Sequence, residues 1–432
     1  MNVWPHISLI VVNWNGRRFL DDCLSSMLAT DYARFSVLVV DNASSDDSVE
    51  FVRRQFPQVE ICRNDFNLGF AVAANIGLRR PGYDIAVILN PDVIVTRDWL
   101  RELVAPMLND PTIGIAGCKL YYPGGRLIQH AGGYVTEPQA LPGHYGLNEQ
   151  ESGQHNSIRD VDYVIGAALA VKRETLDQIG LFDEEYFLYF EDTDLCVRAR
   201  RAGYRVVYVP GATAIHVESV VTNKGSLGYY RHMHTSRWRF LLKHYPCEQI
   251  VHHTVPAERD YVIRCNVEQR WALASAYLAT LTRLPTICAT RVRDGESQVN
   301  PDQVSQIGQE LAGLRQAAMQ TSSPPTERPL SDELHAAWQI KEQPFTSVAP
   351  IVGPLIARFR EMWNSISTKW YVRPLIQQQN AINAQLVEKL LMAQETIATL
   401  DCEISDLRRS QAQVIYELRQ ELAQIRTPKS GV

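Results

Sequence analysis

Short apolar runs alternate with helix-like segments over roughly the first 250 residues of the chain. The runs at residues 7–12, 37–40, 59–62 and 85–89 are rich in Val, Ile and Leu, and apolar positions at helical spacing follow the first run. Strands that alternate with helices at this interval predict an α/β domain built on a parallel sheet. Polar residues follow three of these runs, and ligand sites in such sheets lie at the carboxyl ends of the strands.

The pattern changes after this first region. Residues 251–293 carry an apolar helical face, which fits either packing against the preceding domain or an interfacial membrane helix. Residues 294–350 are rich in Gly, Ser, Gln and Pro and predict a partly disordered linker. Residues 351–432 predict a helical region, in which the heptads of residues 383–425 are typical of a coiled coil, although a helix packed on its own chain fits them too. We therefore expect a main domain at residues 1–250 and a homo-oligomer formed through the coiled coil.

Composition narrows the function classes. The chain has 432 residues, and its 43 basic and 48 acidic residues give a net charge of −5, which argues against a nucleic-acid partner bound by bulk positive charge. The eight cysteines form no C-x-x-C pair, which favours a reducing compartment. We see no signal peptide and no run approaching the ~18 apolar residues of a membrane-spanning helix. We expect a cytoplasmic protein, and peripheral contact with the inner face of the cell membrane stays open.

Candidate nucleotide-binding residues follow the predicted strands. Asp41 ends an apolar run, where its carboxylate can accept hydrogen bonds from a uracil or thymine ring or from a ribose, although Asn42 and Ser44 make a helix cap equally compatible. Gly69 precedes a helix-like segment, and glycine there allows close backbone approach to an anion at the helix start. No G-x-G-x-x-G follows the first run, so a dinucleotide site is not supported.

Two further residues are candidate metal ligands. Asp92 ends the segment Asn90-Pro91-Asp92, where a carboxylate can bind a divalent cation together with diphosphate oxygens, although the same segment fits a simple turn. His216 follows another apolar run and fits either a second ligand or a structural role.

A cluster of carboxylates is the most unusual feature of the chain. Glu191, Asp192 and Asp194 stand at the start of a predicted helix, where acidic residues are stabilising in any case. Such a cluster also offers a general base for a reacting hydroxyl. Further on, basic residues flank aromatic ones and fit either a diphosphate or anionic acceptor site or a solvated helix face: Arg231, Arg237, Arg239 and Lys243.

Taken together, these motifs resemble the family 2 glycosyltransferases of GT-A fold, specifically the bacterial rhamnosyltransferase-like branch. The resemblance covers residues 6–246. The matching positions are residues 11–16, 40–44, 67–71, 89–92, 166–168, 180–184 and 190–195, His216, Ser219 and residues 243–246.

The resemblance implies a GT-A-type mixed sheet with helices on both faces, and it implies roles for single residues. Asp192 would be the general base, with Glu191 or Asp194 orienting it or the acceptor. Asp92 and His216 would hold Mg²⁺ or Mn²⁺, since Asn90 replaces the first Asp of the family's D-x-D motif. Residues on the donor side would be Asn13, Asn15, Asp41, Asn42, Gly69, Phe70, Asn75 and Asn90. Gly166 and Ala167 would line the acceptor side, and Arg237 or Lys243 would stabilise the leaving diphosphate.

The function implied is an inverting transfer of a sugar, with rhamnose favoured, from a nucleotide diphosphate to a hydroxyl of a saccharide or lipid-linked acceptor. Such a reaction would serve the assembly of cell-surface polysaccharide or glycolipid. A nucleotidyltransferase is a weaker alternative, because residues 13–18 are not a Gly-rich phosphate loop. A non-catalytic coiled-coil scaffold with a degenerate nucleotide-sugar domain is another, and the carboxylate cluster argues against it.

Overall fold

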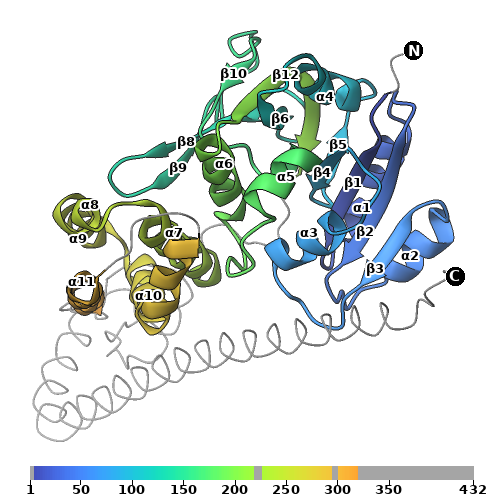
Figure 1. Cartoon of the computed structure of the whole chain (residues 1–432). Helices are drawn as coiled ribbons and strands as arrows, with labels where there is room; N and C mark the ends of the chain where they lie inside the picture. The colour runs from blue at the N-terminus through green and yellow to red at the C-terminus, as the bar shows by residue number, and fades with distance from the viewer. Residues whose placement is uncertain (1–3, 218–225, 294–299, 320–432) are drawn as a thin grey trace, which may run out of the picture. The chain divides into compact units, whose positions relative to one another are not determined.

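A computed structural model of the chain describes residues 4–217, 226–293 and 300–319, and a mixed β-sheet forms its centre (Figure 1). The strands follow the order β10-β12-β6-β11-β4-β1-β2-β3, while β5 pairs with β12 and β7 pairs with β6. Their bounds are β1 Ile7–Asn13, β2 Phe35–Asp41, β3 Glu60–Arg63, β4 Ile85–Leu89, β5 Val93–Val95, β6 Ile113–Tyr121, β7 Ile128–His130, β10 Arg159–Asp160, β11 Ala168–Lys172 and β12 Arg205–His216.

The four strands predicted from the apolar runs are confirmed as β1 to β4, and they pair in parallel. Strand β11 runs antiparallel to both β4 and β6, so the sheet is mixed, as the resemblance implied. The parallel arrangement expected from the alternation alone is therefore correct for β1 to β4 and for the pair of β6 with β12, but not for the pairs that β11 forms.

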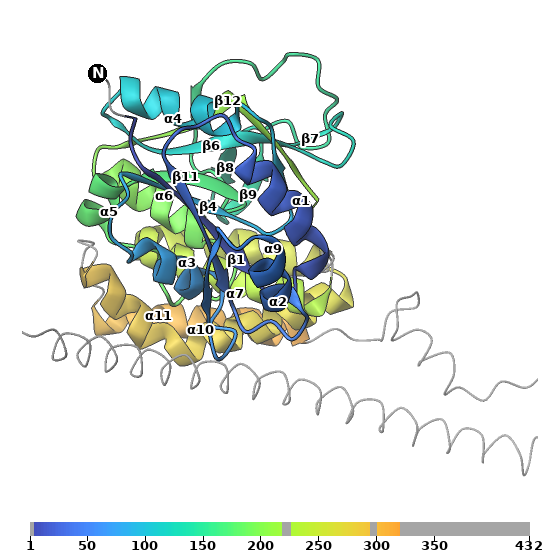
Figure 2. The same ribbon diagram turned by 90° about the vertical axis from the view of Figure 1, so that its right-hand side faces the viewer.

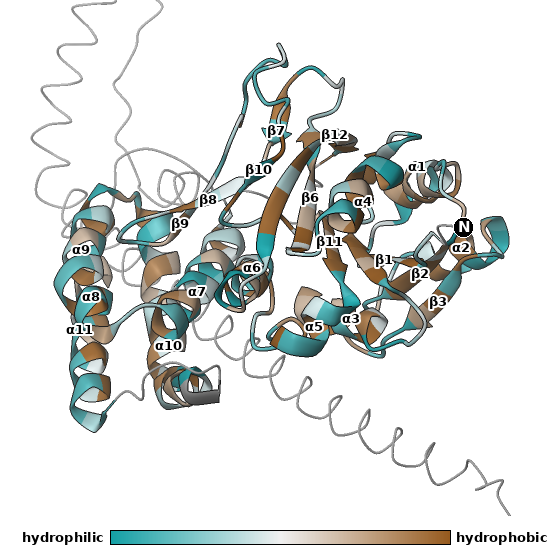
Figure 3. Cartoon of the chain, turned by 45° about the horizontal axis from the view of Figure 1, so that its top comes forward, coloured by the Kyte–Doolittle hydropathy of each residue, from teal (hydrophilic) through white to brown (hydrophobic). Residues whose placement is uncertain are grey.

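Helices cover both faces of this sheet (Figure 2). On one face, Leu24 and Trp99 of the covering helices pack with Val11 and Val87 of the sheet. On the other face, Ala73 and Leu195 belong to a second core cluster. Because the central strands are buried on both sides, they read as continuous apolar runs rather than as alternating ones (Figure 3). The helices of this domain are α1 Arg17–Leu28, α2 Ser48–Gln55, α3 Phe70–Leu78, α4 Trp99–Asn109, α5 Arg173–Ile179 and α6 Glu191–Arg201.

A layer of helices follows the sheet domain and has its own core. It comprises α7 Leu227–His244, α8 Cys247–Gln249, a π-helical turn at Ile250–Thr254, α9 Val255–Arg264, α10 Val267–Arg293 and α11 Pro301–Met319. Trp238 of α7 meets Tyr277 of α10 edge to face, with ring centroids 5.8 Å apart. Residues 251–293, for which an apolar helical face was expected, are helical over most of their length, and apolar residues among them pack in the core of the helical layer. Among the described helices, none is long and apolar enough to span a membrane.

The linker predicted for residues 294–350 is wrong over Pro301–Met319, which forms α11. Ile307, Leu311 and Leu314 recur at helical spacing and are buried in the core of the helical layer. The Gln, Gly and Ser residues between them give the segment the composition of a linker, and a prediction from composition therefore overlooks the helical spacing. Residues 320–350, the helical region at residues 351–432 and its coiled coil at residues 383–425 lie outside the described residues.

A hairpin connects the sheet domain to the helical layer. It consists of β8 Gly133–Thr136 and β9 Leu141–His144, which pair antiparallel (Figure 1). At its tip, the Gln139 carbonyl accepts a hydrogen bond of 2.8 Å from Arg237, and the Gln139 amide donates to the Ala257 carbonyl at 3.2 Å. The helical layer therefore fixes the hairpin that carries His144.

Candidate active site

A cavity of about 600 Å³ lies at the carboxyl ends of β1 and β4 and at the start of α6. This is the edge at which parallel strands of an α/β sheet present their ligands. It brings together ten of the residues predicted for the site: Asn42, Gly69, Phe70, Asn90, Asp92, Gly166, Ala167, Glu191, Asp192 and His216.

Two side chains in the cavity form a candidate metal site. Nε2 of His216 lies 3.4 Å from Oδ1 of Asp92, and both side chains are almost fully buried. Gln129 fixes the imidazole, because its Oε1 accepts a hydrogen bond of 2.7 Å from Nδ1 of His216. With Nδ1 engaged by Gln129, Nε2 is the ring nitrogen that faces the Asp92 carboxylate. Metal sites commonly orient their histidine through such an outer hydrogen-bond partner.

This donor set fits a divalent cation of the Mg²⁺ or Mn²⁺ type. One carboxylate and one imidazole leave most of the coordination positions to other ligands, and Mg²⁺ commonly takes these from substrate phosphates and water. Within the described residues, no three His, Cys, Asp or Glu side chains converge on one point. Asp92 and His216 would therefore hold the ion only together with a phosphate-bearing ligand.

The predicted base, Asp192, is held by backbone amides. Its Oδ2 accepts a hydrogen bond of 2.8 Å from the Gly166 amide, and its Oδ1 accepts one of 2.6 Å from the Thr193 amide. Burial raises the pKa of Asp192 above 3.8, although these hydrogen bonds oppose the shift. A carboxylate of raised pKa that is anchored in one orientation is well suited to accept a proton.

Glu191 differs from its neighbour in its surroundings. It is 5% exposed, and its Oε2 is buried without a hydrogen-bond partner in the described structure. Burial, followed by the charge of Asp192, raises the pKa of Glu191 well above 4.5. Glu191 therefore holds its proton more tightly than an ordinary glutamate does, whereas the backbone hydrogen bonds to Asp192 favour the ionised form of that carboxyl.

The two residues that precede Glu191 and Asp192 have a strained backbone conformation. Tyr189 and Phe190 have φ angles of 68° and 67°, a left-handed conformation that is rare for bulky residues. Each such residue costs on the order of 1–3 kcal/mol, and surrounding contacts must enforce it. Ser236 provides one of these contacts, because its hydroxyl donates to the Leu188 carbonyl at 2.8 Å. The strain fixes the direction in which Glu191 and Asp192 leave the preceding loop.

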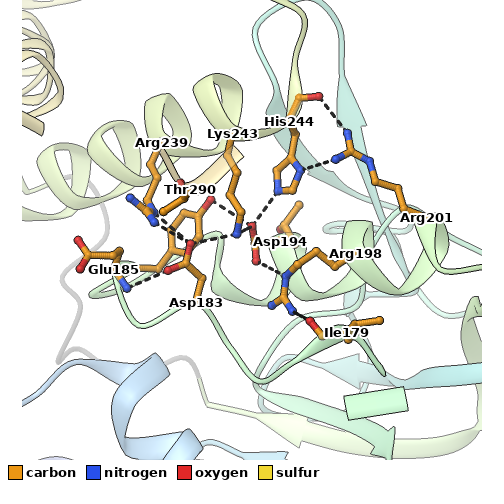
Figure 4. A network of polar contacts seen from close by, with 12 residues as sticks. Ile179, Asp183, Glu185, Asp194, Arg198, Arg201, Arg239, Lys243, His244 and Thr290 are labelled. Carbon is orange, nitrogen blue, oxygen red and sulfur yellow. Dashed lines mark hydrogen bonds and ion pairs between the residues drawn. The ribbon is translucent and has the colours of Figure 1, made fainter. Parts of the chain in front are cut away.

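Asp194 does not reach the cavity, which corrects the role predicted for it. Its carboxylate is fully buried and contacts Arg198 at 2.8 Å, Lys243 at 2.9 Å and His244 at 2.7 Å (Figure 4). Burial alone would raise its pKa, but Arg198, Lys243 and the His244 hydrogen bond hold it well below 3.8. Asp194 therefore joins α6 to α7.

The basic residues predicted to bind diphosphate also lie elsewhere. Arg237 is fully buried and pairs with Glu258 in the helical layer. Lys243 and Arg239 are buried against Asp183, at 3.0 Å and 2.8 Å (Figure 4). Because these side chains are buried in ion pairs, the expected role of Arg237 or Lys243 toward the diphosphate is wrong.

Four of the residues predicted to bind the donor form hydrogen bonds with other parts of the chain. Asn13 and Asp41 have no exposed surface, and Asn13 Nδ2 donates to Asp41 Oδ1 at 2.9 Å. Asn15 Oδ1 accepts a hydrogen bond of 2.8 Å from the Ser45 amide. Asn75 is also buried and donates to the Phe182 carbonyl at 2.9 Å. The structure does not bring these four side chains to the cavity, and direct donor contact by them stays a prediction.

Gly69 is the residue at which the loop after β3 meets the segment before α6. Its φ angle is 83°, and a Cβ there would lie 2.6 Å from the Phe187 carbonyl oxygen. Only glycine combines that conformation with that close approach. The next amide, that of Phe70, donates to the same oxygen at 2.8 Å, and Asn42 Nδ2 donates to the Gly69 carbonyl at 3.1 Å.

Comparison with known proteins assigns the family. A model of the family described as "Glycosyltransferase like family 2" matches residues 5–244. The chain belongs to this family.

Relatives in this family match the same part of the chain. It is 32% identical over 226 residues to an uncharacterised protein of Sinorhizobium fredii, a match that covers 50% of the chain and 25% of that protein. It is 26% identical over 262 residues to the N-acetylglucosaminyl-diphospho-decaprenol L-rhamnosyltransferase of Mycobacterium tuberculosis, covering 54% of the chain and 83% of that enzyme. Among solved structures, TarS residues 1–349 of S. aureus in complex with UDP aligns with a TM-score of 0.46 at 14% identity, over 73% of this chain and 90% of that one.

The cavity also contains residues that sequence reasoning missed. Trp14 lies beside the predicted Asn13 and Asn15 and is 41% exposed. His144 and Tyr163 line the cavity from segments that carry no motif. Further lining rings come from the segment before α6 and from α7: Phe187, Tyr189, Tyr229 and His232. Trp14 within a polar loop, the aromatic run before Glu191 and the tyrosines beside the basic residues are visible in the sequence, but no pattern there assigns them to one cavity.

The charge of the lining is distinctive. Of the described residues that line the cavity, none is a lysine or an arginine. The acidic lining residues are Asp92, Glu191 and Asp192. A diphosphate beside Asp92 would thus meet carboxylates and no lysine or arginine among these described residues, and a bound divalent cation would offset the negative charge.

Proposed function

We propose that the chain is a metal-dependent, inverting glycosyltransferase that moves a sugar from a nucleotide diphosphate to an acceptor hydroxyl. The observation that carries the proposal is the presence, in one cavity, of the Asp92–His216 pair and of the amide-anchored carboxylate Asp192. The first can hold a diphosphate through a cation, and the second can accept a proton.

The cation, when bound, supplies Lewis-acid stabilisation of the charge on the departing diphosphate. The remaining chemistry comes from the chain. Asp192 accepts the proton of the acceptor hydroxyl while the acceptor oxygen forms a bond to the anomeric carbon. The bond from that carbon to the diphosphate oxygen breaks, and its electron pair leaves with the nucleotide diphosphate. Because one displacement from the opposite face completes the transfer, the anomeric configuration inverts.

The different surroundings of Glu191 and Asp192 support this assignment. Burial and the charge of Asp192 raise the pKa of Glu191 well above 4.5, and no hydrogen bond is found to its Oε2 in the described structure. The Gly166 amide orients the Asp192 carboxylate, and this hydrogen bond opposes the rise in its pKa. Of the two, Asp192 is the carboxylate that is positioned as the base.

We further propose a rhamnosyl donor and an acceptor in cell-surface polysaccharide or glycolipid assembly. The similarity to the mycobacterial L-rhamnosyltransferase supports the rhamnosyl donor, and the match covers 83% of that enzyme. Action at the inner face of the cell membrane and assembly through the C-terminal coiled coil remain predictions from the sequence.

Donor binding tests the proposal directly. We would measure the thermal shift of the full chain with dTDP-rhamnose, UDP- and GDP-sugars, each with Mn²⁺, with Mg²⁺ or with EDTA. A ligand that binds only the folded state raises the apparent stability, by about 2.7 kcal/mol at 100 times its Kd. Stabilisation by one donor that requires metal, and that Asp92→Asn abolishes, is the expected result. Equal responses in metal and in EDTA would contradict the metal-dependent part.

A further inference from the structure

One wall of the cavity is built from aromatic rings. Phe187 and His232 stack with centroids 5.2 Å apart and an interplanar angle of 22°. Tyr189 and Tyr229 meet edge to face at 5.4 Å. All four side chains line the cavity and are half-buried. We refer to these four residues as the aromatic wall.

The aromatic wall adjoins the candidate base. The Phe187 carbonyl oxygen accepts a hydrogen bond of 2.8 Å from the Phe70 amide. The Phe70 ring lies 3.2 Å from the position that a Cβ of Gly166 would occupy. The Gly166 amide in turn holds Asp192. The aromatic wall and the carboxylate that would deprotonate the acceptor therefore line the same cavity.

The wall is fixed before any ligand arrives. Phe187 and Tyr189 lie in the loop before Glu191, which is held by hydrogen bonds from the Phe70 amide and the Ser236 hydroxyl. The other half of the wall lies on the first two turns of α7, whose start is capped by Ser226, because the hydroxyl of that residue accepts the Tyr229 amide at 3.1 Å. A surface ordered in advance loses little entropy on binding.

The chemistry of this region selects a neutral sugar ring. Flat apolar rings with a few polar groups are the usual lining of sites that bind small organic molecules, and the C–H face of a pyranose packs on such rings. Polar residues that line the cavity include Tyr163, His144 and Thr193. Among the described lining residues none is a lysine or an arginine, so a phosphate of the acceptor would meet no positive side chain among them.

We propose that the acceptor is recognised as a neutral pyranose ring stacked on the aromatic wall, and that any lipid or diphosphate attached to the sugar contributes little to binding at this site. This inference rests on the function proposed above. It specifies the substrate class on the acceptor side, where a free saccharide and a lipid-linked saccharide share the same ring.

The test compares acceptors that differ only in their attachment. With the donor identified by thermal shift, initial rates would be measured for p-nitrophenyl glycosides and for the same sugars joined through diphosphate to a farnesyl chain. We expect transfer to a neutral glycoside with a KM within about tenfold of that of its lipid diphosphate counterpart. Transfer to the diphosphate-linked acceptors alone would overturn the inference.

Variants of the wall provide the second arm. Tyr229→Leu keeps apolar volume and removes the ring, so it should raise the acceptor KM about tenfold or more, whereas Tyr229→Phe should leave it within about threefold. Leu227→Ala is the matched control, because Leu227 lies in the same turn, is 48% exposed and does not line the cavity. An unchanged acceptor KM in Tyr229→Leu would overturn the inference.

Two safeguards keep the outcomes separate. If Tyr229→Leu does not fold, His232→Leu removes another ring of the wall and should give the same rise in acceptor KM. Donor binding is measured without acceptor. If the wild-type chain binds no donor, the proposed function fails and this inference fails with it. If it binds a donor but the acceptor KM values do not change as predicted, only the inference fails.

Discussion

The carboxylate of Asp192 accepts a hydrogen bond of 2.8 Å from the backbone amide of Gly166, at the point where α6 meets the end of the segment before β11. Glycine allows this approach, because a Cβ at position 166 would lie 3.2 Å from the Phe70 ring and 3.8 Å from Asp192 Oδ2. The contact joins a residue predicted for the acceptor side to the predicted base. It leaves the other face of the carboxylate to the cavity.

Asp192→Asn should therefore abolish most of the turnover and keep donor binding. An amide cannot accept the acceptor proton, and loss of a general base costs about 10²–10⁴-fold in rate. We would measure kcat with saturating donor and the donor Kd by thermal shift, and we expect the Kd to change by less than about threefold. Asp177→Asn, an exposed Asp-to-Asn control, should keep wild-type kcat. Retained turnover in Asp192→Asn would remove Asp192 from the base role.

Gln129→Leu should weaken metal binding although Gln129 is not a ligand. Gln129 accepts a hydrogen bond from Nδ1 of His216, and loss of such an outer partner typically lowers metal affinity about 10–100-fold. The measurement is a Mn²⁺ titration of donor-induced stabilisation. The matched control is Gln154→Leu, because Gln154 is exposed and lies outside the cavity. Identical titrations for Gln129→Leu and the wild-type chain would argue against His216 as a ligand.

Glu191→Gln should stabilise the protein, and the gain should increase with pH. The folded chain holds Glu191 protonated above its ordinary pKa of 4.5, whereas the unfolded chain releases that proton. Stability therefore falls as pH rises from 4.5 toward the raised pKa of the folded state, and a neutral glutamine removes this dependence. We expect the Tm difference between variant and wild type to be small at pH 5 and at least ~2 °C at pH 8. A difference that does not change between these pH values would mean that Glu191 is ionised in the folded chain.

Asp194→Asn should destabilise the protein strongly at neutral pH. It leaves Arg198 and Lys243 partly uncompensated in a buried position, a type of change that costs about 3–5 kcal/mol. Because the pKa of Asp194 is held well below 3.8, its contribution is fully present above 3.8 and is lost as pH falls toward the folded-state value. The Tm gap to wild type should thus be large at pH 7 and shrink below pH 3.8. Asp177→Asn, which affects an exposed ion pair, should shift Tm by less than about 2 °C at both pH values.

The sequence predicted the elements that are buried on both sides and the residues that stand at strand ends. Apolar runs specify β1 and β4 because a central strand that is buried on both faces is predominantly apolar. Asp92 was predicted as a site residue because it lies just beyond the end of β4, and position near a strand end is visible in the order of residues. The carboxylates of α6 were recognised as a group because they cluster at the start of a predicted helix.

Three-dimensional contacts decided what the sequence left open. Asp192 and Asp194 are two residues apart, and only the packing of α7 determines that the first lines the cavity while the second is buried against Lys243. The aromatic wall joins Phe187 to His232, which have no local pattern in common. Gln129 supports His216 across a separation of 87 residues, and nothing near Gln129 indicates that role.

The most direct measurement is the release of nucleoside diphosphate from a panel of nucleotide sugars by the full chain, with Mn²⁺ or Mg²⁺ and then with excess EDTA. The account predicts release from one donor, faster when a saccharide acceptor is added, and stopped by EDTA. A folded chain that releases nothing from any donor under any of these conditions would contradict the account and favour a non-catalytic role.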